Sequence, residues 1–234
     1  MSVAGDRGAA GGSLAAPVPL HLRLGQPRLR GVSHVVAAWA AALVAATLIA
    51  LAPAGTPRVA ALVYGLGLWA LFAGSGTYHR WRWDVRWRPL LRRVDHSTIY
   101  VFIAASYTPI ALLALHGATQ AVVLGGVWAG ALAGVLLSVV WIDAPRWLGA
   151  ATYLALGWVA LLAVPQLLAA LPAWPLALLL AGGLLYSAGA VVYARQRPDP
   201  WPQTFGFHEL FHAFVIAAAI THVVAIAGWV LPAG

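Results

Sequence analysis

The chain has 234 residues, of which 62% are hydrophobic and only 9% are charged. Soluble domains carry roughly a quarter charged residues, so this composition excludes a water-soluble globular protein and predicts an integral protein of the cell membrane. The net charge of +8 arises from 14 arginines without any lysine. These arginines lie between long apolar runs, which argues against nucleic-acid binding. The absence of cysteine excludes disulfides and thiolate metal sites.

The first 33 residues are rich in Gly, Ala, Pro and Arg and have no sustained apolar period, so they predict a disordered cytoplasmic tail. The rest, 34–234, is expected to form one all-α domain of seven transmembrane helices. Continuous apolar windows of this length favour membrane-spanning helices over the short alternating strands of a barrel. The first window is longer than the apolar part of a cleaved signal peptide and is expected to be retained. The fifth window is the weakest candidate for a spanning helix, because three prolines crowd its exit. The windows are 35–52, 59–78, 98–115, 121–142, 148–164, 174–194 and 210–231.

The arginines are distributed very unequally between the two sides of this arrangement. Thirteen lie on the side of the N-terminus, and only Arg58 lies on the other side. Short loops that carry Arg remain in the cytoplasm, so the N-terminus is predicted to be cytoplasmic and the C-terminus external. The Arg-Trp stretch 80–88 is typical of an interfacial anchor, with a specific lipid head-group site as the alternative.

Five polar residues are predicted to meet at the cytoplasmic face. His79 ends the second window with Ser75 four residues earlier on the same helix face, Asp95 precedes the third window, and His208 and His212 open the seventh. Three imidazoles plus a water form a known catalytic zinc arrangement. We therefore expect Zn²⁺ to be bound by the three histidines, with Asp95 orienting or deprotonating the water and Ser75 contacting it or a developing oxyanion.

The segment 208–212 also matches the H-E-x-x-H pattern, in which the Glu is the general base of a zinc protease. Here the pattern opens a membrane helix instead of lining a soluble cleft. Glu209 is therefore expected to be a solvated acid of the first helical turn, favoured by the helix dipole.

Four further histidines fit the cluster less well. His34 and His96 are expected to lie at the membrane interface, and His116 falls on the outer side. His222 follows His212 by ten residues, about 15 Å along a helix. It is expected to be a buried residue that forms hydrogen bonds.

Three ordered motifs carry a family resemblance: Ser75-Gly-Thr-Tyr-His79; Asp95-His96 with Ile99-Tyr100 and Ser106-Tyr-Thr-Pro109; and His208-Glu-Leu-Phe-His212 with His222. From about residue 30 to 230 the chain resembles the hemolysin III family, the bacterial branch of the progestin and adiponectin Q receptors. The resemblance implies seven helices, a cytoplasmic N-terminus and a zinc ion near that face. It assigns His79, His208 and His212 as ligands, with Asp95 and Ser75 beside the bound water. The wider group includes alkaline ceramidases, which hydrolyse lipid amides.

Three functions follow as hypotheses. The favoured one is a zinc-dependent hydrolase of a lipid amide or ester at the cytoplasmic leaflet, with membrane lipids as partners and substrate. The alternative is a non-catalytic receptor or membrane-state sensor whose zinc is structural. A structural zinc normally has four protein ligands, whereas this sequence offers three histidines and an aspartate that is either a ligand or a neighbour. A pore-former is the weakest hypothesis, because the helices carry no polar stripe.

Overall fold

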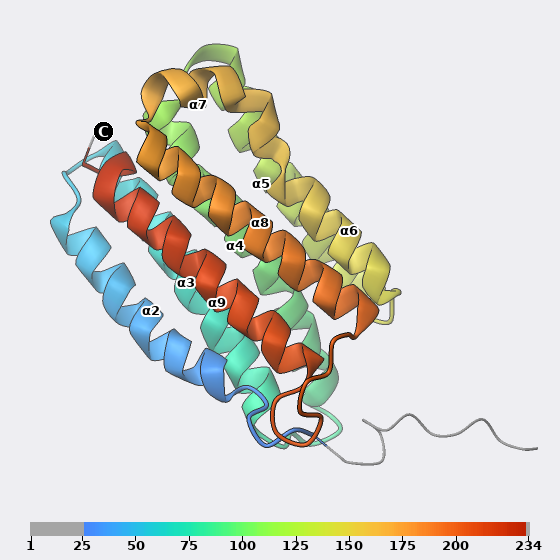
Figure 1. Cartoon of the computed structure of the whole chain (residues 1–234). Helices are drawn as coiled ribbons and strands as arrows, with labels where there is room; N and C mark the ends of the chain where they lie inside the picture. Colours follow the sequence, from blue (N-terminus) through green and yellow to red (C-terminus); the bar gives the residue numbers. More distant parts are fainter. Residues whose placement is uncertain (1–25, 233–234) are drawn as a thin grey trace, which may run out of the picture.

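The computed structural model describes residues 26–232 as a bundle of helices (Figure 1). Seven helical stretches are long and apolar enough to cross a membrane, which confirms the predicted all-α membrane fold. The predicted tail lies outside this part of the chain as far as residue 25. Five spans are single helices: α2 (Val32–Leu51), α3 (Thr56–Arg80), α4 (Arg88–Ala114), α5 (Gly117–Val140) and α8 (Ala173–Arg195). The last span consists of α9 (Phe207–Ala225) and its extension η2 (Ile226–Val230).

Neighbouring spans in the sequence are mostly neighbours in space. Helix α3 packs between α2 and α4, α5 packs on α4, and α9 lies against α8 and returns to α2 (Figure 1). Between residues 26 and 232 the only β structure is an isolated bridge between Trp201 and Phe205. Because the number of spans is odd, the described chain begins and ends at opposite ends of the bundle.

Close contacts between helices occur at glycines of α3. A Cβ added at Gly65 would lie 2.8 Å from the Cβ of Ala45 in α2, and one at Gly67 would lie 2.5 Å from the Cβ of Ala105 in α4. Both distances are shorter than any real carbon contact. These small residues let three helices approach closely, as is common in membranes.

The fifth span is broken. Helix α6 (Arg146–Gly157) is followed by a 3₁₀ turn, η1 (Val159–Ala163), and by α7 (Val164–Ala170). The predicted window ended at residue 164, whereas the helical path continues to Ala170. Pro165 does not end it, because this proline stands in the first turn of α7, where its missing N–H would have no partner within the helix.

Hydrogen bonds with side chains of other helices stabilise this break. The hydroxyl of Tyr107 in α4 donates to the carbonyl of Gly157 at 2.5 Å and accepts from the N–H of Ala160 at 2.9 Å. The indole of Trp158 donates to the hydroxyl of Ser187 in α8 at 3.1 Å. Unpaired backbone groups are costly in a bilayer, so these bonds make the break part of the fold.

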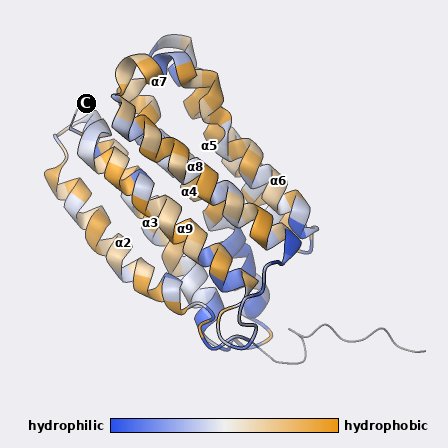
Figure 2. Ribbon diagram, viewed as in Figure 1, coloured by the Kyte–Doolittle hydropathy of each residue, from blue (hydrophilic) through white to orange (hydrophobic). Residues whose placement is uncertain are grey.

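The hydrophilic residues gather at one end of the bundle, where α3 ends and α4 begins (Figure 2). Among the residues that the structure describes, every arginine except Arg58 lies at or beyond this end. Helix α4 begins ten residues before the predicted window of 98–115, so Asp95 lies two turns inside the helix instead of ahead of it. Proline at the start of α4 suits a helix N-terminus that lacks intrahelical partners.

Candidate metal centre

Three histidines converge at the hydrophilic end of the bundle. His79 is in the last turn of α3, and His208 and His212 are one turn apart at the start of α9. The Nε2 atoms of His79 and His208 are 3.2 Å apart. One ring nitrogen from each of the three histidines lies within 4.8 Å of the other two. The i, i+4 spacing on α9 and the antiparallel approach of α3 therefore create a compact group of nitrogen donors.

This group fits a tetrahedral metal ion. Two nitrogen ligands at about 2.05 Å from zinc are about 3.3 Å apart in a tetrahedral site, close to the separation of the His79 and His208 nitrogens. The Nδ1 atom of His212 is buried without a hydrogen-bond partner among residues 26–232. Buried polar atoms normally have a partner, so this imidazole is not fully satisfied by the protein.

Asp95 stands at one corner of the histidine group. Its Oδ2 lies 3.4 Å from Nε2 of His79 and 3.6 Å from Nδ1 of His96, and the residue is 6% exposed. His96, expected at the interface, is partly buried beside this carboxylate and its Nδ1 also donates to the carbonyl of Arg92 at 2.8 Å. Asp95 is thus held next to His79 but is not one of the three residues whose candidate ligand atoms lie within 4.8 Å of one another.

His34 occupies a different place from the one expected. Predicted to be interfacial, it is 2% exposed and its ring stacks on that of His212, with centroids 3.6 Å apart and an interplanar angle of 10°. Its Nδ1 lies 2.8 Å from the hydroxyl oxygen of Ser75, which is itself 4% exposed. The ring is buried because the start of α2 lies beside the end of α3 and the start of α9. A fourth histidine therefore supports one predicted ligand and fixes the predicted catalytic serine.

The expectation of a solvated Glu209 is wrong. The residue is 2% exposed, its Oε1 accepts from Nε of Arg30 at 2.5 Å, and its Oε2 accepts from the N–H of Gly206 at 2.9 Å. Glu209 does not belong to the group of metal-ligand atoms. Its carboxylate instead caps the N-terminus of α9 and forms an ion pair with Arg30. Asp95 is therefore the acid next to the histidines.

A short segment ahead of α2 covers this part of the site. The N–H groups of Arg28 and Leu29 donate to the carbonyls of Gln203 and Thr204 at 3.0 and 3.2 Å. Gly31 has a φ of 74°, and a Cβ built there would lie 2.9 Å from the Cβ of His79. The segment has no apolar period, and its fold over the histidines was not predicted from the sequence. Gly31, directly before the first span, is the single local signal for a turn there.

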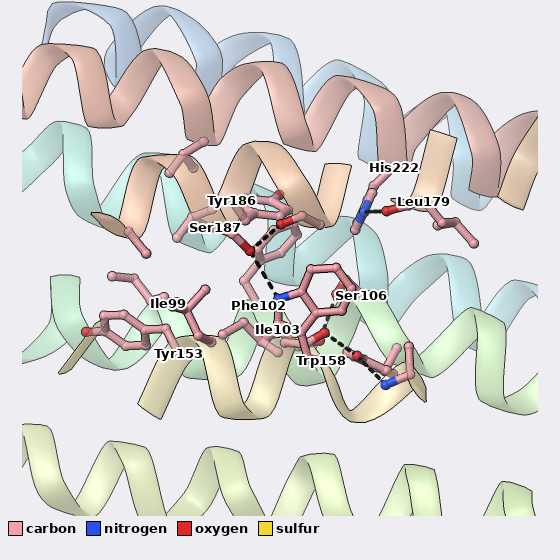
Figure 3. A pocket seen from close by; sticks show the side chains of 18 of the residues that line it. Ile99, Phe102, Ile103, Ser106, Tyr153, Trp158, Leu179, Tyr186, Ser187 and His222 are labelled. Carbon is pink, nitrogen blue, oxygen red and sulfur yellow. Dashed lines mark hydrogen bonds between the residues drawn. The ribbon is translucent and has the colours of Figure 1, made fainter. Parts of the chain in front are cut away.

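A cavity of about 370 Å³ extends from the histidines into the membrane part of the bundle. His79, Asp95, His208 and His212 line it at one end, and aliphatic and aromatic side chains of α4, α8 and the broken fifth span line the rest (Figure 3). His222 also reaches it, with Nε2 3.2 Å from the carbonyl oxygen of Leu179, which confirms the predicted hydrogen bonding. The site therefore joins a polar end to a long apolar chamber. The sequence did not indicate this cavity.

Comparison with known proteins identifies relatives over most of the chain. Residues 22–223 match the family described as Haemolysin-III related. The hemolysin-3 homolog of Bacillus subtilis is 31% identical over 67% of this chain and 70% of its own length. Hemolysin-3 of Bacillus cereus is 31% identical over 74% of this chain and 76% of its own length. The heptahelical transmembrane protein ADIPOR2 of Oryza sativa subsp. japonica is 33% identical over 74% and 82%, respectively. Together with the seven spans and the three ordered motifs, these matches show that the chain is a multi-pass membrane protein of the Haemolysin-III related family.

Proposed function

We propose that the protein is a zinc-dependent hydrolase that cleaves an amide or ester bond of a membrane lipid. One observation carries this proposal: three imidazoles and a carboxylate lie together at one end of an apolar cavity inside a membrane protein. The apolar cavity is suited to an acyl chain, and its polar end is suited to the bond that joins the chain to a head group.

In this proposal His79, His208 and His212 hold the zinc ion. When bound, zinc acts as a Lewis acid and lowers the pKa of a coordinated water to about 7. Asp95 would act as the general base, accepting a proton from a water molecule at this end of the cavity as the water oxygen attacks the carbonyl carbon of the lipid. The C–N or C–O bond then breaks, and the proton passes from Asp95 to the leaving amine or alcohol. The products are a fatty acid and the freed head group.

Ser75 and His34 have supporting roles in the same scheme. The 2.8 Å contact between His34 Nδ1 and Ser75 Oγ fixes the direction of the serine hydroxyl. When the imidazole donates to the serine oxygen, the hydroxyl hydrogen is free to donate to the carbonyl oxygen of the lipid. Such a donor stabilises the negative charge that develops on this oxygen.

A non-catalytic sensor with a structural metal is the second candidate, and the position of Asp95 favours it. The 3.4 Å between Asp95 Oδ2 and His79 Nε2 is close to the spacing of two ligands on one tetrahedral ion. With Asp95 as a fourth ligand, the site would be closed, as structural zinc sites are.

The two candidates differ in the behaviour of an Asp95→Asn variant. The test presents ceramide-like amides and phospholipid esters in mixed micelles to the purified, zinc-loaded protein and measures fatty-acid release. A hydrolase loses about 10²- to 10⁴-fold in turnover, the usual contribution of a general base, and Ser75→Ala loses less. Asp143→Asn is the matched control, because Asp143 is exposed and pairs with Arg92. If the parent protein releases no more fatty acid than Asp95→Asn on any of these lipids, the sensor is the better explanation.

We also propose that the histidine end of the bundle faces the cytoplasm. Support comes from the arginines, all of which except Arg58 lie at this end in the described part of the chain. An alkaline-phosphatase fusion after Leu231 should be active and one after Arg88 inactive. The reverse pattern would place the hydrolytic site at the outer leaflet.

A further inference from the structure

Two polar residues, Tyr186 of α8 and His222 of α9, line the cavity far from the histidine group (Figure 3). Their ring centroids are 5.5 Å apart. His222 follows the metal-ligand candidate His212 by ten residues, or about 15 Å along the helix axis. This depth places the pair near the middle of the membrane, where polar groups are costly.

The chain makes specific room for this pair. A Cβ built on Gly182 of α8 would lie 2.4 Å from Nε2 of His222. Any larger residue would therefore push the imidazole away from its place. With glycine there, Nε2 lies 3.2 Å from the carbonyl oxygen of Leu179. The position of the imidazole is thus fixed by both packing and a hydrogen bond.

That hydrogen bond also decides which nitrogen of His222 carries the proton. A carbonyl oxygen only accepts, so Nε2 must be the donor, and in a neutral imidazole Nδ1 is then an acceptor. Nδ1 of His222 and the hydroxyl of Tyr186 are both buried and have no hydrogen-bond partner among residues 26–232. The two groups together therefore offer one pure acceptor and one group that donates or accepts.

We propose that His222 and Tyr186 bind a hydroxyl group carried within the chain of the lipid that occupies the cavity. A hydroxyl would donate to Nδ1 of His222 and accept from the hydroxyl of Tyr186. A carbonyl oxygen in the chain has no hydrogen to give to Nδ1 and satisfies only half of the pair. An unsubstituted chain satisfies neither. This inference rests on the proposed lipid function and names a subclass of its ligands, the hydroxylated acyl chains.

The depth of the pair sets the position of the hydroxyl. An extended hydrocarbon chain advances about 1.25 Å per carbon for bonds of about 1.5 Å, so about 15 Å corresponds to about twelve carbons from the metal end. A ligand with its hydroxyl near the twelfth carbon should therefore fit best.

The test compares octadecanoic acid with its 12-hydroxy and 2-hydroxy derivatives. Each acid competes with a fluorescent fatty acid for the purified full-length protein in detergent micelles. The carboxylate is common to all three, so its contribution cancels for the 12-hydroxy and unsubstituted acids. We expect the 12-hydroxy acid to bind about 5- to 10-fold more tightly than octadecanoic acid, as expected for one or two buried hydrogen bonds. The affinity of the 2-hydroxy acid should not depend on the hydroxyl of Tyr186.

Two variants assign the preference to the pair. Tyr186→Phe removes one oxygen and keeps the ring, and it should reduce the preference for the 12-hydroxy acid to less than 2-fold. His222→Phe should do the same. Tyr153→Phe is the matched control, because it removes another hydroxyl from the same cavity at a residue that packs on Tyr100 instead, and the preference should persist.

Each other outcome contradicts the inference in a recognisable way. Equal affinities for the 12-hydroxy and unsubstituted acids would show that the pair does not bind a ligand hydroxyl. A preference that survives in both Tyr186→Phe and His222→Phe would place the hydroxyl elsewhere. Failure of every acid to displace the probe would overturn the lipid-binding proposal as well, whereas equal binding of all three acids overturns only the hydroxyl site.

Discussion

The two sides of the bundle are built differently. On the side of α2, α3 and α9 the helices are continuous, and polar side chains pair with one another, as Arg30 does with Glu209 and His34 with Ser75. On the side of the fifth span the helix is broken, and only 11% of its apolar stretch is buried, compared with 56% for α3. The side of α2, α3 and α9 carries the metal-ligand candidates, and the broken, mostly exposed span forms part of the cavity wall. A metal needs fixed distances between its ligands, which continuous helices provide, whereas the cavity needs only an apolar lining for a chain.

The largest effect expected from this comparison is loss of the metal. Replacing both His208 and His212 by Ala leaves one of three proposed ligands, so zinc measured by elemental analysis should fall from one per chain to nearly zero. His222→Ala is the control on the same helix, and it should keep its zinc because it lies about 15 Å deeper. Full zinc content in the double variant would rule out this site.

The next effect concerns the ion pair between the buried Glu209 and the partly buried Arg30. Glu209→Ala leaves Arg30 without its partner, and breaking a buried pair costs about 3 kcal/mol. The midpoint of thermal unfolding in detergent should therefore fall by several degrees. Asp143→Ala removes the acid of an exposed pair with Arg92, which contributes less than about 1 kcal/mol. If the two variants unfold at the same temperature, the Glu209 pair is not structural.

The smallest effect should be confined to the broken span. Tyr107→Phe removes the hydroxyl that bonds to Gly157 and Ala160, at a cost of about 1–3 kcal/mol for the backbone groups left unpaired. Amide hydrogen exchange should accelerate around residues 155–163 and stay unchanged in α3. Tyr78→Phe is the control, because no hydrogen bond of its hydroxyl is found in the described chain. Faster exchange throughout the bundle would show that the break is not a separate structural unit.

The sequence predicted the spans well because long apolar windows reflect the bilayer and need no knowledge of neighbouring helices. It missed the break in the fifth span. Gly157 and Trp158 are weak local signals, and the hydroxyl that stabilises the break belongs to Tyr107, 50 residues away from Gly157. Such a contact is a property of the tertiary structure and not of any window.

The same distinction holds for the site. His79, His208 and His212 were placed together by helix periodicity and by their shared membrane face. His34 and Glu209 were assigned wrongly, because the burial of His34 depends on how α2 packs beside α3 and α9, and that of Glu209 on how the segment before α2 places Arg30. The cavity was not predicted at all, since it depends on the packing of several helices at once.

The segment before α2 has a practical consequence for producing the protein. Arg30 is the cation that Glu209 faces, and Arg28 and Leu29 hold the loop that precedes α9 through backbone hydrogen bonds. A shortened chain that starts at Val32 would keep every span yet lose all of these contacts. A purification tag or fusion partner is therefore better attached ahead of Gln26, with a linker, than directly to the first span.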